Sequence, residues 1–140
     1  MRKKEGSLAR KLKLALPRRA IMADLLEHLE LPQCTCLNAS SDHPIRHCLD
    51  AEHKNDNSSF LESDADEELL IHLTFMQAVK ISHIHIAGVD EATAPSGMKL
   101  FVNKVGLDFD SAKSDKPTQE FDFTAAQVEM TAKPTELRYV

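Results

Sequence analysis

The stretch that most constrains this sequence is residues 69–86, because its apolar residues follow the two-residue period of a β-strand. Within residues 69–75, four apolar side chains fall on one face of the predicted strand: Leu69, Ile71, Leu73 and Phe75. Farther along, Val79 and Ile81 are out of phase with Ile84 and Ile86. Either both faces of this second run are buried or a bulge resets the phase, and we favour a bulge near Ser82 and His83.

Three later segments show the same alternation, at residues 98–102, 119–123 and 137–140. Short strands joined by turns, with little helix between them, predict an all-β antiparallel sandwich. In the clearest segment, Phe121 and Phe123 are predicted to point inward. The predicted core collects the inward positions of all these strands: Leu69, Ile71, Leu73, Phe75, Val79, Ile81, Leu100, Val102, Phe121 and Phe123.

Residues 1–21 differ in charge from the rest of the chain. The first 20 residues contain eight Lys or Arg and one Glu, a charge of +7, so the other 120 residues carry −12 of the total of −5. Leu8, Leu12 and Leu16 have helical spacing, which predicts a basic amphipathic helix. This segment is either an organelle transit peptide or, as we favour, a disordered basic tail or a basic extension ahead of a start at Met22. In both cases we expect it to be dispensable for the fold.

Two further segments complete the predicted organisation. Residues 22–33 are a short helix and linker, with the helix over Asp24–Leu31 and an end at Pro32. Residues 34–140 are the sandwich domain, which begins with a long polar loop and one short strand near Cys36 and Leu37. We therefore expect a β-sandwich preceded by short N-terminal helices.

The composition excludes several classes of protein. A length of 140 residues fits one domain. The acidic body lacks the basic surface that phosphate contacts require, so we expect no nucleic-acid partner. No apolar run approaches the ~20 residues that span a membrane. Because three cysteines cannot all pair, a reducing compartment is favoured.

A cluster of zinc-competent side chains lies within fifteen residues: Cys34, Cys36, His43, His47 and Cys48. The Cys-x-Cys spacing is tighter than the Cys-x₂₋₄-Cys of structural zinc sites. Ordinary buried or loop thiols are therefore the favoured interpretation, and no cofactor is predicted. A thiol- or zinc-binding function stays open as an alternative.

Histidines and carboxylates form two more groups. His83 and His85 share one face of a strand, and with His72 on a neighbouring strand they predict an exposed His-rich face. Before the central strand lie four carboxylates: Asp64, Asp66, Glu67 and Glu68. They do not fit a calcium-binding EF-hand loop, because no Gly occupies its sixth position. They form either a solvated acidic turn or a charged docking patch.

Other polar residues have simpler interpretations. Asp108 and Asp110 are expected to be turn and capping residues, and Asp110 or Ser111 could begin a single helical turn within residues 107–114. The sequence contains no Gly-x-Ser-x-Gly motif, phosphate-binding loop or metalloprotease helix. We therefore predict that the protein is not an enzyme.

Five segments occur here in the order in which they occur in a known family: CLNASSDHPIRHCL, FLESDADEELLIHLTFMQAVKISHIHIAG, MKLFVN, LDFDSAKSDKPTQEFDF and LRYV. Together they resemble the PITH domain, and the match runs from Cys36 to Val140. Its most specific pieces are LESDADEELLI and DFDSAKSDKPTQ. The resemblance implies a galactose-binding-like jelly roll in the cytoplasm and nucleus. It also implies association with the regulatory particle of the 26S proteasome, and packing roles for Cys36 and Cys48.

The sequence departs from the family pattern at both ends. No thioredoxin domain with a Cys-x-x-Cys pair precedes the match, and the family pattern continues past Tyr139 and Val140. We therefore expect the sandwich to be incomplete at its C-terminal side and marginally stable.

Three functions follow for comparison. The first is a non-catalytic module that binds the proteasome, and the second is the thiol or zinc protein. The third is a carbohydrate-binding jelly roll, which the implied fold alone supports. Sugar binding relies on exposed aromatic rings, and this chain has no Trp and one Tyr.

Overall fold

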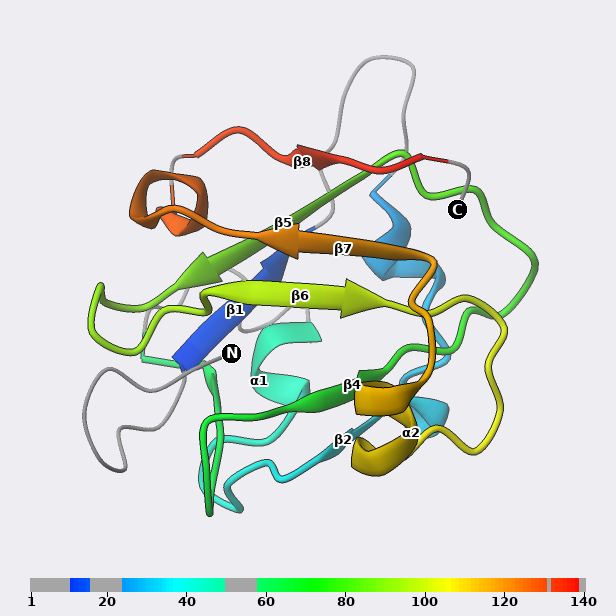
Figure 1. The fold of residues 1–140 in the computed structure, drawn as a ribbon, viewed down its shortest axis with the longest axis horizontal. Helices are drawn as coiled ribbons and strands as arrows, with labels where there is room; N and C mark the ends of the chain where they lie inside the picture. Colours follow the sequence, from blue (N-terminus) through cyan, green and yellow to red (C-terminus); the bar gives the residue numbers. More distant parts are fainter. Residues whose placement is uncertain (1–10, 16–23, 50–57, 131, 139–140) are drawn as a thin grey trace.

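The protein is mostly short strands joined by turns. A computed structural model describes residues 11–15, 24–49, 58–130 and 132–138 (Figure 1). In these residues the helices are short, and every strand pair is antiparallel. The prediction is confirmed at the level of a β-rich protein with small antiparallel sheets. No helix in this part of the chain is long and apolar enough to cross a membrane.

The largest sheet has four strands in the order β3–β1–β5–β8. These strands are β1 (Lys11–Ala15), β3 (Leu61–Glu62), β5 (His83–Gly88) and β8 (Thr135–Glu136). A strand was expected at residues 137–140, of which residues 139–140 lie outside the described residues; β8 ends just before this segment, and Leu137 is buried. The sheet joins segments from both ends of the chain.

Two smaller sheets have two strands each. One pairs β2 (Thr35–Leu37) with β4 (Leu70–His72), and the other pairs β6 (Gly97–Leu100) with β7 (Gln119–Asp122). The predicted strands near Cys36, at residues 98–102 and at residues 119–123 are thus confirmed to within a few residues.

Strand β1 corrects the prediction of a basic helix. Leu8, Leu12 and Leu16 have helical spacing, but residues Lys11–Ala15 form a strand between β3 and β5. Leu12 is only 2% exposed and belongs to the hydrophobic core. The sequence KLKLA fits either structure, because its two leucines also alternate with period two, and the neighbouring strands decide between them. These five residues are therefore part of the fold, whereas Leu8 and Leu16 lie outside the described residues.

The run at residues 69–86 also differs from its prediction. Leu70–His72 forms β4 and His83–Gly88 forms β5, and no strand lies between them. Phe75 makes only an isolated bridge to Leu29. The change of phase between residues 79–81 and 84–86 is therefore not a bulge within one strand. The chain leaves the β2–β4 sheet after His72 and joins the four-stranded sheet at His83.

The core is built from residues that the alternation did not identify. Its buried members come largely from short strands, turns and helical turns: Leu12, Leu29, Cys34, Ile45, Cys48, Leu49, Leu61, Ile84 and Leu137. Most of the predicted core residues pack around this cluster, half-buried: Leu69, Ile71, Leu73, Phe75, Ile81, Leu100 and Phe121. Val79 and Phe123 are also half-buried, and Val102 is 38% exposed. The alternation therefore identified most of the half-buried residues around the core but not the buried residues at its centre.

The helices are single turns or little longer. The helix expected at Asp24–Leu31 is two short 3₁₀ helices, Leu25–His28 and Leu31–Gln33, the first of which has Asp24 as its N-cap. The backbone N–H of Leu26 donates to Asp24 Oδ1 over 3.1 Å. Pro32 lies inside the second helix, where its missing N–H costs no hydrogen bond. Helices α1 (Arg46–Leu49) and α2 (Phe109–Ser114) follow later in the chain.

Candidate functional site: the acidic turn and helix α2

The acidic turn, residues 63–69, is organised by the side chain of Asn38. Its Nδ2 donates to the backbone oxygens of Asp66 and Glu68, over 3.2 and 2.7 Å. Its Oδ1 accepts from the backbone N–H of Ala65 over 3.0 Å. The Asn38 side chain thus lies inside the turn and makes the hydrogen bonds that a neighbouring backbone would otherwise make.

The conformation of Asn38 suits this role. Its φ angle is +67°, in the left-handed region that Asn tolerates better than most residues. Its own backbone oxygen also accepts from the N–H of Asp64 over 2.9 Å. Sequence reasoning missed Asn38 because the residues it contacts lie about 27 positions away, and no local pattern reveals such a pairing.

The four predicted carboxylates have different surroundings. Asp64 and Asp66 are exposed, and Glu67 and Glu68 are half-buried. Asp66 Oδ1 accepts from Asn38 Nδ2 and from the backbone N–H of Glu68, both over 2.9 Å. Asp66 therefore helps to build the turn, whereas the charge of Asp64 is directed to solvent. The structure keeps these carboxylates together in one ordered turn.

Helix α2 lies next to the acidic turn. Lys113 Nζ on this helix is 3.4 Å from Glu68 Oε1 on the turn. The ion pair joins the two most specific segments of the family resemblance, LESDADEELLI and DFDSAKSDKPTQ. Segments that are about 45 residues apart in sequence therefore form one continuous surface, which we call the acidic-turn surface (residues 63–69 with α2).

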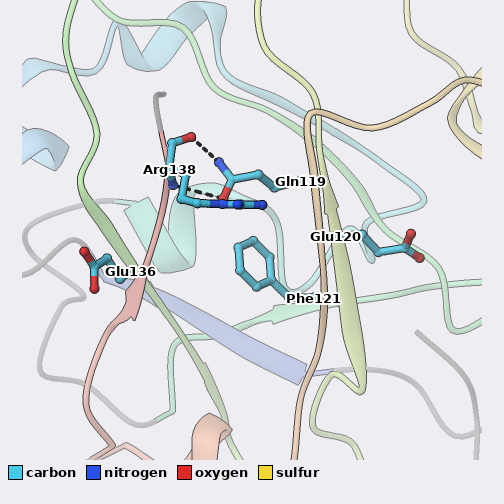
Figure 2. Close-up of a pocket in the computed structure, with 5 residues that line it drawn as sticks. All are labelled: Gln119, Glu120, Phe121, Glu136 and Arg138. Carbon is cyan, nitrogen blue, oxygen red and sulfur yellow. Dashed lines mark hydrogen bonds between the residues drawn. The ribbon is translucent and has the colours of Figure 1, made fainter.

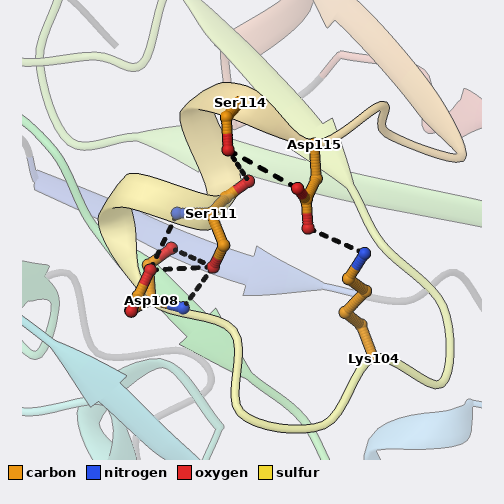
Figure 3. Close-up of polar contacts among 5 residues, drawn as sticks. All are labelled: Lys104, Asp108, Ser111, Ser114 and Asp115. Atoms are coloured by element: carbon orange, nitrogen blue, oxygen red, sulfur yellow. Dashed lines mark hydrogen bonds and ion pairs between the residues drawn. The ribbon is translucent and has the colours of Figure 1, made fainter.

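The start of α2 is fixed by a reciprocal cap (Figure 3). Asp108 Oδ1 accepts from the backbone N–H of Ser111 over 2.7 Å, and Ser111 Oγ accepts from the N–H of Asp108 over 2.9 Å. The backbone N–H and the hydroxyl of Ser111 both donate to the Asp108 carboxylate, and these bonds lower the pKa of Asp108 because they favour its ionised form. Asp108, one of the two aspartates expected to cap, is thus the N-cap, and Ser111 completes the box from inside the helix. The start expected at Asp110 or Ser111 was wrong, because both residues lie within α2.

The end of α2 is held to the preceding loop. Lys104 Nζ lies 2.8 Å from Asp115 Oδ2, just after the last helical residue (Figure 3). The backbone N–H of Asp115 donates to the Ser111 oxygen over 2.7 Å. A helix of six residues has little stability of its own, so these contacts set its place beside the acidic turn.

The cysteines of the predicted zinc cluster have separate environments. Cys34 is buried against Thr74, whose backbone N–H donates to its sulfur over 3.4 Å. Cys48 is buried in α1, where its thiol donates to the Ile45 oxygen over 3.2 Å. Burial raises the pKa of Cys36 to about 12, so its thiol stays protonated at neutral pH. These environments favour structural thiols over metal ligands.

The histidines of that cluster pack on other groups. His43 stacks on Phe60 with 4.0 Å between ring centroids, and its Nε2 is 3.7 Å from Glu62 Oε2. His47 meets His43 edge-on at 5.8 Å. Among the described residues, no three His, Cys, Asp or Glu side chains come together as a possible metal site.

The predicted His-rich face is wrong. His85 is buried, and its Nε2 lies 2.9 Å from the backbone oxygen of Glu129. His72 is exposed, but it belongs to the β2–β4 sheet and not to the sheet of His83 and His85. The prediction failed because it placed β4 and β5 side by side, and the chain instead separates them into different sheets.

A shallow hollow lies between β7 and β8 (Figure 2). It is lined by Gln119, Glu120, Phe121, Glu136 and Arg138. The Gln119 amide closes one end, because it donates to the Arg138 oxygen over 2.6 Å and accepts from the Arg138 N–H over 3.0 Å. The side chain of Gln119 thus joins the β6–β7 sheet to the four-stranded sheet.

Comparison with known proteins identifies related sequences. A family model described as the PITH domain matches residues 17–140. Thioredoxin-like protein 1 of Schizosaccharomyces pombe is 39% identical over 100 residues, which are 69% of this chain and 33% of that protein. PITH domain-containing protein 1 of Dictyostelium discoideum is 33% identical over 121 residues, which are 83% of this chain and 59% of that protein.

A human protein is also similar to this chain. PITH domain-containing protein 1 of Homo sapiens is 36% identical over 104 residues, which are 74% of this chain and 49% of that protein. The chain therefore spans between about a third and three fifths of the length of these curated relatives. Neither the family description nor these names are those of an enzyme.

Proposed function

Because the chain belongs to the PITH domain family, we propose that it is a non-catalytic binding module that associates with the 26S proteasome through its regulatory particle. The acidic-turn surface is the proposed contact region. The observation that carries this choice is the support that Asn38 gives to the turn. A surface that is already ordered loses less conformational entropy when a partner binds.

Charge gives the expected chemistry of the partner. The turn holds four carboxylates within five consecutive residues, in a chain that is acidic outside its first 20 residues: Asp64, Asp66, Glu67 and Glu68. Carboxylates held this close repel one another, and a basic partner surface would relieve the repulsion. The proposed partner surface is therefore rich in Lys and Arg, and binding should weaken as the salt concentration rises.

Binding to purified 26S proteasome tests the proposal. The informative variant carries Asp64→Asn, Glu67→Gln and Glu68→Gln, and it keeps Asp66 because that carboxylate holds the turn together. A matched control carries Glu120→Gln, Asp122→Asn and Glu136→Gln, which removes the same charge from exposed residues of β7 and β8.

The outcomes separate the two parts of the proposal. We expect the wild-type chain and the control to bind alike and the turn variant to bind at least ten times more weakly. Equal weakening of both variants would remove the acidic turn as the contact region while leaving proteasome binding in place. Absence of binding by the folded wild-type chain would overturn proteasome association itself.

The cellular location is a further part of the proposal. We place the protein in the cytoplasm and nucleus, where the family resemblance locates it. A cleavable transit peptide within residues 1–20 would remove β1, which supplies the buried Leu12 to the core. Microscopy of the chain with a C-terminal tag is the test, and a shortened product inside an organelle would favour the transit-peptide alternative.

The finer fold assignment also remains a proposal. We place the three antiparallel sheets in a galactose-binding-like jelly roll, as the family resemblance implies. The strands are short and come from distant parts of the chain, as in sandwiches with long crossing connections. An experimental structure in which β6 and β7 face the four-stranded sheet across the core would support this assignment. A single continuous sheet would contradict it.

A further inference from the structure

Strand β1 lies between β3 and β5 and pairs with both; we call the position between these two strands the strand slot. On one side, Lys11 is opposite Glu62 and Leu12 is opposite Leu61. On the other side, residues 12–15 are opposite residues 85–88 of β5. The PITH family match begins at residue 17, so the strand in the middle of this sheet comes from outside the matched region.

The slot has a defined shape at the position of Leu12. Leu12 is 2% exposed and its partner Leu61 is fully buried. Its partner on the other side is Gly88, so β5 contributes no side chain at this position. Gly88 also accepts no larger residue, because a Cβ there would lie 2.5 Å from the Cβ of Ala94. The slot therefore selects one large aliphatic side chain at its centre.

The remaining contacts of the slot depend little on sequence. Strand pairing uses backbone N–H and C=O groups, so any extended segment with the right alternation can supply them. Without β1, β3 would lose its partner in the sheet, and Leu61 would lose its neighbour in the core. The acidic body also favours a basic occupant, and residues 1–20 carry a charge of +7.

We propose that the slot between β3 and β5 is a strand-acceptor site, and that residues 11–15 of a second copy of this chain can occupy it. In one chain, the eight residues 16–23 join β1 to the rest of the domain. Such a short tether gives a local concentration in the millimolar range, so a chain at low concentration fills its own slot. At high protein concentration, the same strand can be exchanged between copies with no loss of contacts. This inference does not depend on the proteasome proposal.

A peptide of residues 8–18 probes the slot directly. The full chain carrying Leu12→Pro and Leu14→Pro cannot use its own β1, because proline lacks the N–H that strand pairing needs. We expect the labelled peptide to bind this variant, to raise its melting temperature, and to bind the wild-type chain at least ten times more weakly. A peptide with Leu12→Asp should also bind at least ten times more weakly. Failure of the unmodified peptide to bind the folded variant would overturn the acceptor site.

A second measurement applies if the proline variant does not fold. A protease site placed within residues 16–23 of the otherwise wild-type chain allows β1 to be cut from the rest of the domain after folding. We expect the cut segment to stay bound on gel filtration and to be replaced by labelled peptide over time. Separation of the cut segment from the domain would overturn the proposal.

Exchange between copies tests the occupant. Two populations of the full chain with different tags are mixed at about millimolar concentration, partly unfolded and refolded together. We expect mixed dimers that contain both tags, and we expect Leu12→Asp in both populations to abolish them. If the peptide binds the slot but no mixed dimers form, the second copy is excluded and each chain fills the slot with its own β1.

Discussion

The strand slot and the acidic turn are both shaped by residues distant in sequence, but different forces hold them. In the slot, Leu12 and Leu61 are buried and the backbone ladder of β1 does the joining. In the turn, the side chain of one residue, Asn38, makes the connections, and much of the surrounding carboxylate surface stays in water. Changes in the slot should therefore alter stability most, and changes in the turn should alter recognition most.

The largest effect on stability is expected in the strand slot. Leu61→Ala removes a fully buried side chain beside β1 and should lower the free energy of unfolding by about 2–5 kcal/mol. Urea denaturation followed by circular dichroism measures the loss. Leu37→Ala is the matched control, because Leu37 is 45% exposed and should change stability by less than about 1 kcal/mol. Equal losses in the two variants would show that Leu61 is not in the core.

Asn38 should give the next largest effect. Asn38→Asp keeps the oxygen that accepts from Ala65, but it removes the Nδ2 donor and brings a charge next to Asp66. We expect a loss of about 1–3 kcal/mol in urea denaturation, since the turn oxygens lose their donor. Asn38→Gly tolerates the positive φ angle and should be less harmful if repulsion dominates. A wild-type stability for Asn38→Asp would mean that Asn38 does not hold the turn.

The cap of α2 should have a smaller, pH-dependent effect. The pKa of Asp108 is lowered in the folded chain, so its cap stabilises the fold above the ordinary aspartate pKa of about 3.9. That contribution is lost as the pH falls through the lowered folded-state pKa. We expect wild type to melt slightly above Asp108→Ala at pH 7, and the difference to shrink below about pH 4. Melting curves between pH 7 and 3 test this, and a pH-independent difference would contradict it.

The smallest effect is expected for the ion pair between α2 and the turn. Lys113 is 63% exposed, and surface pairs of this kind contribute about 0–1 kcal/mol. Lys113→Ala should therefore leave the urea midpoint almost unchanged, and Lys113→Glu should not weaken binding to the proposed partner surface rich in Lys and Arg. A loss above about 2 kcal/mol for Lys113→Ala would show that the pair is far more buried than its exposure indicates.

Sequence patterns located most strands of the smaller sheets but not the way the sheets join. Residues 119–123 alternate clearly, and β7 formed there with Phe121 half-buried. Residues 69–86 look like one long strand region, yet β4 and β5 pair with different partners. Alternation reports which face of a strand is buried, and it contains no information about which strand lies beside it.

The candidate site divides in the same way. The four carboxylates of the turn and the capping role of Asp108 follow from residue types and spacing. Asn38 and the contact between Lys113 and Glu68 do not, because they join positions about 30 and 45 residues apart. Cys34 and Cys36 look like possible metal ligands from their spacing, and only the structure places Cys34 in the core and Cys36 half-buried against it.

By itself, the sequence determined the family, the strand-rich class, the acidic turn and the local cap, because each depends on residues that are close together or on a motif read in order. Only the tertiary structure decided that Lys11–Ala15 is a strand, that Leu61 lies at the centre of the core, and that His85 is buried. These outcomes depend on which segments meet in space. A sequence such as KLKLA satisfies the periods of both helix and strand, and the hydrogen bonds offered by β3 and β5 select the strand.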